Sequence, residues 1–186
     1  FKGGPQTAKR RLRRFIHRHL QNYDTNRNQP QTDDISCMSP YLHFGHISPV
    51  FLALKVVESG RGTQDDRDAY LEELVIRREL AVNYIYHTPS YDRYEALPTW
   101  ARKSLDQHRH DHRPHLYSRE ALEAADTHDP YWNAAMREMA VSGYMHNYMR
   151  MYWGKKILEW SATPEEGYET ALYLNNKYFL DGRDAN

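Results

Sequence analysis

The run from residue 64 to residue 87 constrains the fold of this chain more than any other feature. Its apolar residues recur at helical spacing among charged ones, and no breaker interrupts the run before Pro89. A turn-forming segment, Ser59-Gly60-Arg61-Gly62, precedes it, so the pattern predicts one long helix over 64–87. No alternating valine- or isoleucine-rich run of strand length occurs in the sequence, and we therefore predict an all-α fold.

The same spacing predicts further helices along the rest of the chain. Ser39 before Pro40 and Ser48 before Pro49 are typical helix N-caps with proline at the first helical position. These two adjacent helix starts form a candidate anion-binding site. The predicted helices cover residues 6–23, 49–58, 64–87, 98–107, 118–125, 130–142, 145–160 and 164–178.

The composition limits the class of protein. The chain has 186 residues, of which 40% are hydrophobic, and this fits one domain over residues 1–186 with a core of its own. The 25 basic and 25 acidic residues cancel, so any nucleic-acid contact must use a local patch. With a single cysteine, Cys37, no intramolecular disulfide can form, and no apolar run of 18 residues is present. We expect a monomer in a reducing compartment, without a membrane span.

Two charged segments can each be interpreted either as a solvated surface or as a functional site. The basic helix over 6–23 either contacts phosphate groups or presents a solvated outer face. The segment 108–115 carries alternate histidines, but it is polar, contains Pro114 and lacks cysteine, so we predict solvated histidines and no metal site. No nucleotide-binding loop, zinc-protease motif or nucleophile elbow is present.

The segment 132–160 combines tryptophans with an arginine. Trp153 and Trp160 are seven residues apart, so on one helix they share a face about 10 Å apart along the axis. This spacing suits electron transfer between indoles, although aromatic residues two turns apart are also typical of a core. Arg150 lies on the same helix, and a pair with Asp181 would either adjust the electronics of a planar cofactor or tie the last turn to the helix.

Six stretches, in order along nearly the whole chain, resemble the C-terminal, flavin-binding helical domain of DNA photolyases, in particular the class II cyclobutane pyrimidine dimer photolyases. The stretches are Phe1-Lys-Gly-Gly4, Ser39-Pro-Tyr-Leu-His-Phe-Gly45, Glu72-Glu-Leu-Val-Ile-Arg-Arg-Glu-Leu80, Thr127-His-Asp-Pro-Tyr-Trp-Asn-Ala134, Met149-Arg-Met-Tyr-Trp-Gly-Lys-Lys-Ile-Leu-Glu-Trp160 and Tyr173-Leu-Asn-Asn-Lys-Tyr-Phe-Leu-Asp-Gly-Arg-Asp184.

The resemblance implies a FAD held in a helical bundle and a light-driven reaction on ultraviolet-damaged DNA. The excited, fully reduced flavin would donate an electron to a pyrimidine dimer flipped out of the duplex, and the cyclobutane ring would split. Base flipping fits this substrate, because a damaged pair costs little to unstack. The implied location is the cytoplasm, near the nucleoid, or the nucleus.

The resemblance also implies roles for individual residues. Contacts to the flavin are implied for Tyr23, Ser36, Cys37, Met38, Ser39, Asn147, Arg150, Asn175, Asp181 and Asp184, with Asn175 facing the flavin N5. Contacts to the dimer are implied for Glu73, Met151 and Asn147, and contacts to DNA for Arg27, Glu73 and Arg77. Electron transfer is implied for Trp132, Trp153 and Trp160, with Trp160 nearest the surface.

Three positions depart from the family's pattern. Ile35 stands where many relatives have threonine, Arg77 where some have tryptophan, and Asn147 where many class II members have glycine. The family's N-terminal α/β antenna domain and its last helices are missing from this chain, so we expect no antenna chromophore on it. Two alternatives remain: a cryptochrome-like photoreceptor that uses the same tryptophans, and a helical interaction module without a cofactor.

Overall fold

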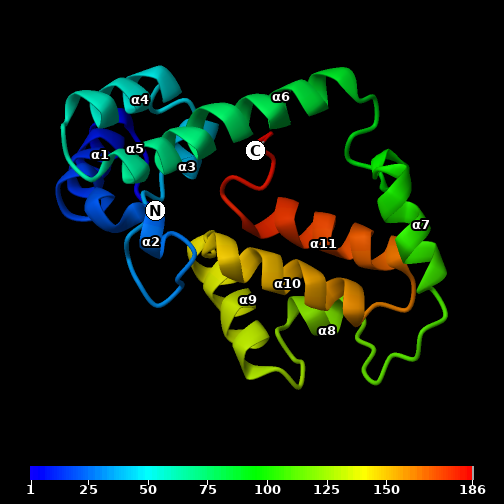
Figure 1. Ribbon diagram of the computed structural model, residues 1–186. Helices are drawn as coiled ribbons and strands as arrows, with labels where there is room; N and C mark the ends of the chain where they lie inside the picture. Colours follow the sequence, from blue (N-terminus) through cyan, green and yellow to red (C-terminus); the bar gives the residue numbers. More distant parts are fainter. Residues whose placement is uncertain (186) are drawn as a thin grey trace. The chain divides into compact units, whose positions relative to one another are not determined.

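The computed structural model describes residues 1–185, and that range is helical without any strand, so the all-α prediction is confirmed (Figure 1). It divides into two compact units. Unit 1 comprises Phe1–Tyr84 together with Asp184 and Ala185, and unit 2 comprises Ile85–Arg183. The single domain over 1–186 stays a prediction for the chain as a whole. Within the described range, none of the helices combines the length and the apolar character needed to cross a bilayer.

Unit 1 is built from short helices whose starts follow the capping residues. The Ser48 hydroxyl oxygen accepts from the backbone N–H of Phe51, so this N-cap was predicted correctly. The prediction that Ser39 caps a helix was wrong. The helix already includes Ser39, and the preceding residue, the buried Met38, has helical backbone angles and provides no side-chain cap. The helices are α1 (Pro5–Arg18), a 3-10 turn (Leu20–Asn22), α2 (Tyr23–Asn26), α3 (Ser39–His43), α4 (Pro49–Glu58), α5 (Gln64–Leu71) and α6 (Arg78–His87), which continues into unit 2.

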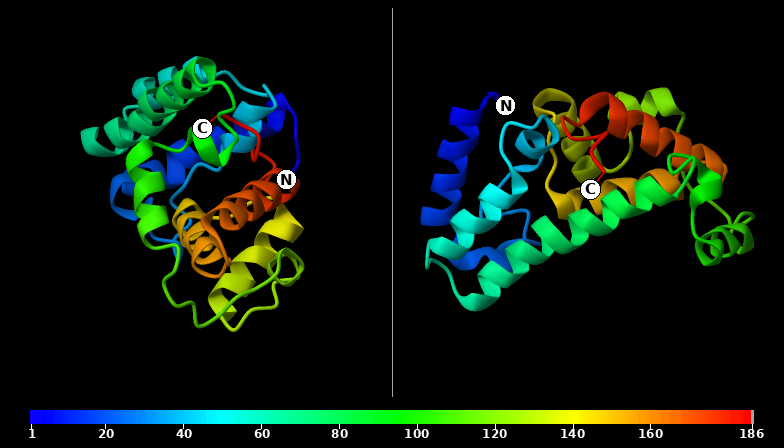
Figure 2. Two further views of the ribbon diagram at one scale, coloured as in Figure 1. Left: turned by 90° about the vertical axis from the view of Figure 1, so that its right-hand side faces the viewer. Right: turned by 90° about the horizontal axis from the view of Figure 1, so that it is seen from above.

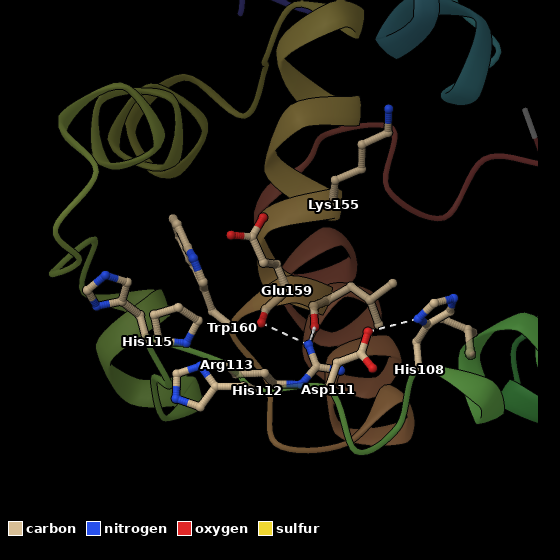
Figure 3. A pocket seen from close by; sticks show the side chains of 11 residues that line it. His108, Asp111, His112, Arg113, His115, Lys155, Glu159 and Trp160 are labelled. Atoms are coloured by element: carbon tan, nitrogen blue, oxygen red, sulfur yellow. Dashed lines mark hydrogen bonds and ion pairs between the residues drawn. The ribbon is translucent and has the colours of Figure 1, made fainter.

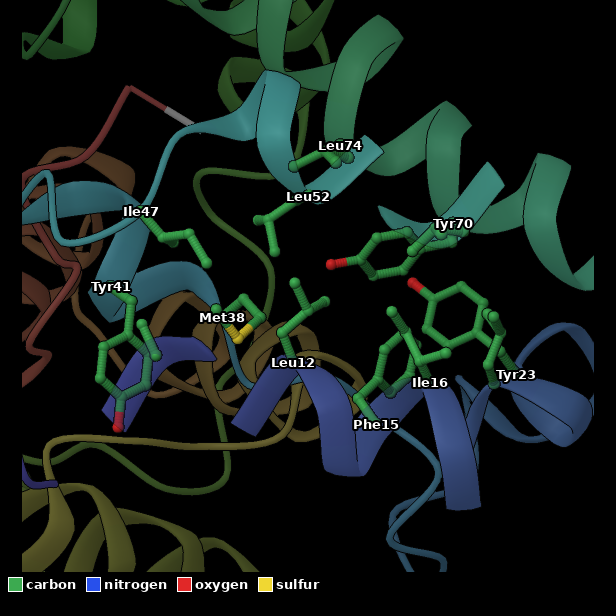
Figure 4. Packing of buried hydrophobic residues seen from close by; sticks show 13 residues of the cluster. Leu12, Phe15, Ile16, Tyr23, Met38, Tyr41, Ile47, Leu52, Tyr70 and Leu74 are labelled. Atoms are coloured by element: carbon green, nitrogen blue, oxygen red, sulfur yellow. The ribbon is translucent and has the colours of Figure 1, made fainter. Parts of the chain in front are cut away.

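The core of unit 1 is an aromatic and aliphatic cluster between α1 and α5 (Figure 4). Phe15 of α1 lies 5.0 Å from Tyr70 and 5.7 Å from Tyr23, measured between ring centroids. Tyr23 and Tyr70 meet edge to face at 5.3 Å, a favourable arrangement for aromatic pairs. This cluster fixes Tyr23, one of the predicted flavin contacts.

The predicted helix 64–87 is present, with one irregular segment in the middle. Residues Glu72–Arg77 form a π-helix between α5 and α6. Such segments are rare and frequently occur at functional sites. This one carries Glu73 and Arg77, two residues for which the sequence implies contact with DNA.

Unit 2 holds the tryptophans. Its helices α10 (Asn147–Glu159) and α11 (Pro164–Tyr178) run side by side (Figures 1 and 2). Helix α9 (Pro130–Ser142) has Gly143 as its C-cap, and the φ of 71° at this glycine lies in the left-handed region that favours glycine. After the 3-10 turn Tyr94–Ala96, the helices are α7 (Thr99–Gln107), α8 (Arg119–Glu123), α9 (Pro130–Ser142), α10 (Asn147–Glu159) and α11 (Pro164–Tyr178).

Candidate functional site

The arginine–aspartate pair predicted in unit 2 is present. Arg150 on α10 donates from Nη2 to Oδ1 of Asp181 over 3.0 Å, and Asp181 is only 6% exposed. The guanidinium carbon lies 3.8 Å from the ring centroid of Phe179, so the arginine is also held by a cation–π contact. A charge-assisted pair at a buried carboxylate fixes the direction of the guanidinium.

Within residues 1–185, three buried polar atoms of the segment 146–153 find no hydrogen-bond partner. They are Nε of Arg150, Nε2 of His146 and Nε1 of Trp153, all on or directly before α10. The His146 Nδ1 caps α10 by accepting from the backbone N–H of Tyr148, and burial lowers the pKa of this histidine. Because an unsatisfied buried donor costs about 1–3 kcal/mol, these atoms are suited to a further polar partner. The donors fit the acceptor atoms of a flavin ring system.

The other residues of unit 2 for which contacts to the flavin or the dimer are implied lie on or near α10 and α11. Asn147 is exposed and Met151 is half-exposed, so both side chains are available to a ligand. Asn175 donates from Nδ2 to the Gly182 carbonyl oxygen over 2.6 Å, and it thereby holds the turn that carries Asp181. A Cβ atom at Gly182 would collide with the backbone of Asn175, so the turn requires glycine there.

The three tryptophans form one buried cluster in unit 2. The rings of Trp132 and Trp160 lie 5.6 Å apart, edge to face, and the Nε1–H of Trp132 donates to the Trp153 carbonyl oxygen over 3.1 Å. All three are at most 3% exposed. Trp160, implied to be nearest the surface, is itself 1% exposed, but its ring lines a pocket of about 380 Å³ together with histidines, Arg113 and Lys155 (Figure 3).

In unit 1 the structure pairs two residues for which DNA contact is implied. Arg27 donates from Nη1 to Oε1 of Glu73 over 2.6 Å, and the Glu73 side chain is 45% exposed. Burial alone would lower the pKa of Arg27, but the hydrogen bond to Glu73 raises it. Burial raises the pKa of the neighbouring Tyr23 to about 12. Arg77 lies on the same π-helical segment and pairs with Glu72 instead.

Residues 36–39 lie in unit 1 after α2 and lead into α3, whose first residue is Ser39. The Ser36 carbonyl oxygen accepts from Nε of Arg11 over 3.0 Å, and Cys37 has a left-handed φ of 49°. Ser39 is exposed, whereas the Met38 side chain is 2% exposed and belongs to the core. Any contact of Met38 with a cofactor must therefore come from its backbone.

Asp184 has partners within unit 1. Arg78 donates to both of its carboxylate oxygens, over 2.9 and 3.3 Å, and His43 Nδ1 lies 3.2 Å from Oδ2. The sequence suggested neither partner, although both lie within the stretches that resemble photolyases. The predicted flavin contact of Asp184 stays a prediction. Among residues 1–185 no group of His, Cys, Asp and Glu side chains is arranged to hold a metal ion.

Known proteins resemble this chain in sequence and in fold. It is 49% identical over its full length to a deoxyribodipyrimidine photo-lyase of Methanothermobacter thermautotrophicus, and 52% identical over 91% of its length to one of Oryza sativa. It spans 41% and 34% of these two relatives. A crystal structure of a class III photolyase from Agrobacterium tumefaciens matches 98% of this chain and 39% of that one, with a TM-score of 0.66 and 22% identity, which shows the shared fold. No family model matches the chain.

Proposed function

The chain is homologous over its whole length to a part of the deoxyribodipyrimidine photo-lyases, and from this relationship we propose that it is the FAD-binding, catalytic part of a light-driven enzyme that repairs cyclobutane pyrimidine dimers. The observation that carries the proposal is the pair of Arg150 with buried Asp181, beside buried donors that lack partners. When bound, FAD supplies the light absorption and the transferable electron. The stretches that resemble class II enzymes support the assignment to that class, and ultraviolet-damaged DNA in the nucleoid or nucleus is the proposed partner.

The residues of unit 2 have defined tasks in this proposal. Arg150, which Asp181 and Phe179 hold in place, provides a fixed positive charge that stabilises negative charge on the reduced ring system. Neutral His146 keeps the first turn of α10 in place without adding a second charge. Trp132, Trp153 and Trp160 provide a buried path for the electron that reduces the cofactor.

The residues of unit 1 serve the lesion and the DNA. Glu73 presents a half-exposed carboxylate that can accept from the imide N–H of a thymine, and Arg27 orients it through their ion pair. Arg77 lies on the same π-helical segment, where its 60% exposed side chain is available to a phosphate.

The absorption spectrum of the chain after incubation with FAD and desalting tests cofactor binding. We expect a structured flavin band that bleaches under blue light in the presence of a reductant. Arg150→Met should weaken this retention, whereas Lys155→Met, which changes an exposed cation of the same helix, should not. Circular dichroism of both variants verifies that they are folded. A parent chain that retains no flavin would refute the proposal for this chain.

Repair of dimer-containing DNA by the chemically reduced, FAD-loaded chain tests the substrate. We expect light-dependent loss of cyclobutane dimers and no action on (6–4) photoproducts. Glu73→Gln should reduce repair while flavin retention stays unchanged. The matched control is Glu79→Gln, which alters an exposed carboxylate of the following helix α6. Flavin binding and photoreduction without any repair would favour the photoreceptor alternative.

A further inference from the structure

A tyrosine of unit 2 is held against Trp160 by two independent contacts. The rings of Tyr117 and Trp160 lie 5.5 Å apart at 72°, and the backbone N–H of Tyr117 donates to the Trp160 carbonyl oxygen over 3.1 Å. The loop that precedes α8 is therefore fastened to the end of α10 at this point. Ring contact of this kind allows an electron to pass directly between the two side chains.

The hydroxyl group of Tyr117 has a defined direction. Its oxygen accepts from the backbone N–H of His128 over 3.0 Å and lies 2.8 Å from Nδ1 of the same histidine. Since the backbone N–H occupies one acceptor position, the phenolic O–H is free to donate to Nδ1 of a neutral His128. The backbone contact fixes the phenol, and the imidazole is placed to take its proton.

The imidazole of His128 connects this hydroxyl to the surface. His128 stacks on His115 with ring centroids 3.9 Å apart, and both histidines are exposed. His115 also lines the pocket that contains Trp160 (Figure 3). A proton accepted by His128 can therefore pass to solvent.

We propose that Tyr117 and His128 form a proton-coupled electron donor for Trp160. The proposal rests on the proposed function, because light-driven flavin reduction is the step that removes an electron from Trp160. The Trp160 radical cation takes one electron from the phenol, the Tyr117 O–H bond breaks, and the proton moves to His128 Nδ1. The products are neutral Trp160, a neutral phenoxyl radical on Tyr117 and an imidazolium on His128, so one electron and one proton are transferred and charge is conserved.

This transfer explains why the phenol needs the histidine. Removing an electron from a tyrosine that keeps its proton creates a strongly acidic radical cation, whereas transfer of the proton to a nearby base avoids that state. Loss of the imidazolium proton to solvent would then remove the direct route back. The oxidised end of the tryptophan cluster would thus become a long-lived tyrosyl radical that a soluble reductant can reach at the surface.

Laser photoionisation of the flavin-free chain, at a wavelength that only indoles absorb, tests this step without cofactor or repair. Light removes an electron from a buried indole as well as from an exposed one, and Trp100→Phe serves as the background because the radical of this 75% exposed side chain would otherwise contribute to the signal. In this background the remaining tryptophans are 132, 153 and 160. We expect the indole-radical absorption to decay while a phenoxyl-radical absorption rises with the same rate constant.

Three further variants in that background decide the outcome. Tyr117→Phe should abolish the correlated phenoxyl rise, and His128→Gln should slow it and alter its hydrogen–deuterium isotope effect. Tyr86→Phe is the matched control, because Tyr86 also lies beside a histidine, His87, but is 82% exposed; it should leave the rise unchanged. A correlated rise that persists in Tyr117→Phe, or its absence in the background chain, would overturn the proposal. Neither result depends on flavin binding, so the two proposals fail separately.

Discussion

The indole Nε1–H of Trp132 donates a hydrogen bond to the backbone carbonyl oxygen of Trp153 over 3.1 Å. Trp132 also meets the ring of Trp160 at 5.6 Å, so this residue of α9 links two tryptophans that lie seven residues apart on α10 and at its end. The contact with α9 therefore adds a second route between Trp153 and Trp160, beside the one along their own helix. The same contacts make Trp132 a structural centre of unit 2.

Replacing Trp132 with phenylalanine should destabilise unit 2. The variant leaves a cavity at a side chain that is 0% exposed and removes the hydrogen bond to the Trp153 carbonyl. We expect a loss of about 2–4 kcal/mol in the free energy of unfolding. Urea denaturation monitored by circular dichroism measures it, with Trp100→Phe as the exposed control that should change little. A Trp132→Phe variant as stable as the parent would contradict this account of the cluster.

Replacing Trp160 with phenylalanine should slow photoreduction of bound, oxidised FAD. Trp160 is the member of the cluster that contacts Tyr117 and lines the pocket, so its loss interrupts the path toward solvent. Repair by chemically reduced FAD should be spared, because that reaction does not use the path. Absorption spectra recorded during blue illumination compare the rate of flavin reduction in the variant and the parent. Equal photoreduction in both would exclude Trp160 from the path.

Asp184→Asn should destabilise unit 1. Arg78 is paired in a bidentate manner with a carboxylate whose side chain is 7% exposed, and the substitution leaves this guanidinium without its negative partner. We expect a loss of about 3 kcal/mol, since removal of one partner from a buried pair is strongly destabilising. Denaturation of Asp33→Asn provides the control, because the Asp33 pair with Arg14 is mostly exposed and should contribute little. Similar effects of both substitutions would be inconsistent with the role of burial.

The Asp66 carboxylate should give unit 1 a stability that depends on pH. Burial alone would raise the pKa of Asp66, but hydrogen bonds from the backbone N–H groups of Asp24 and Thr63 and from the Thr63 hydroxyl lower it below its ordinary value of 3.8. With a lowered pKa in the folded state, this stabilisation is fully present above the unfolded-state pKa. It is lost as the pH falls below 3.8 through the lower folded-state pKa.

The comparison of the parent with Asp66→Asn measures this dependence. At neutral pH the variant should be less stable by about 1 kcal/mol, because an amide has one acceptor oxygen in place of two, so its NH2 group would face either the Asp24 N–H or the two donors of Thr63. The difference should shrink as the pH falls below 3.8. Asp68→Asn is the exposed control on the same helix, and its difference from the parent should stay constant over that range. A difference for Asp66→Asn that is independent of pH would argue against the assigned hydrogen bonds.

Much of the fold could be predicted because its signals are local. The helices predicted over 49–58, 130–142 and 164–178 have those bounds in the structure, and each has proline at its first position after a capping side chain. The Arg150–Asp181 pair also followed from the sequence, because the resemblance placed both residues at one ring system. The role of this pair, and of the other predicted site residues, stays a prediction.

What the sequence did not indicate depends on contacts between distant residues. Arg78 and Asp184 are 106 positions apart, and no periodic pattern relates them. Tyr117 and His128 lie in irregular segments on either side of α8, where hydrophobic spacing carries no information about which side chains meet. The π-helical segment was also missed, because its residues continue the same apolar spacing as the helices on either side.

Because Asp184 belongs to unit 1, unit 2 is an insertion within the sequence of unit 1. The chain leaves unit 1 after Tyr84, builds unit 2, and returns to unit 1 at Asp184. During synthesis on the ribosome, Arg78 is therefore made 106 residues, and His43 141 residues, before their anionic partner. Loss of the Asp184 carboxylate, far from Arg78 and His43 in sequence, would consequently destabilise unit 1 rather than unit 2, whose residues precede it directly.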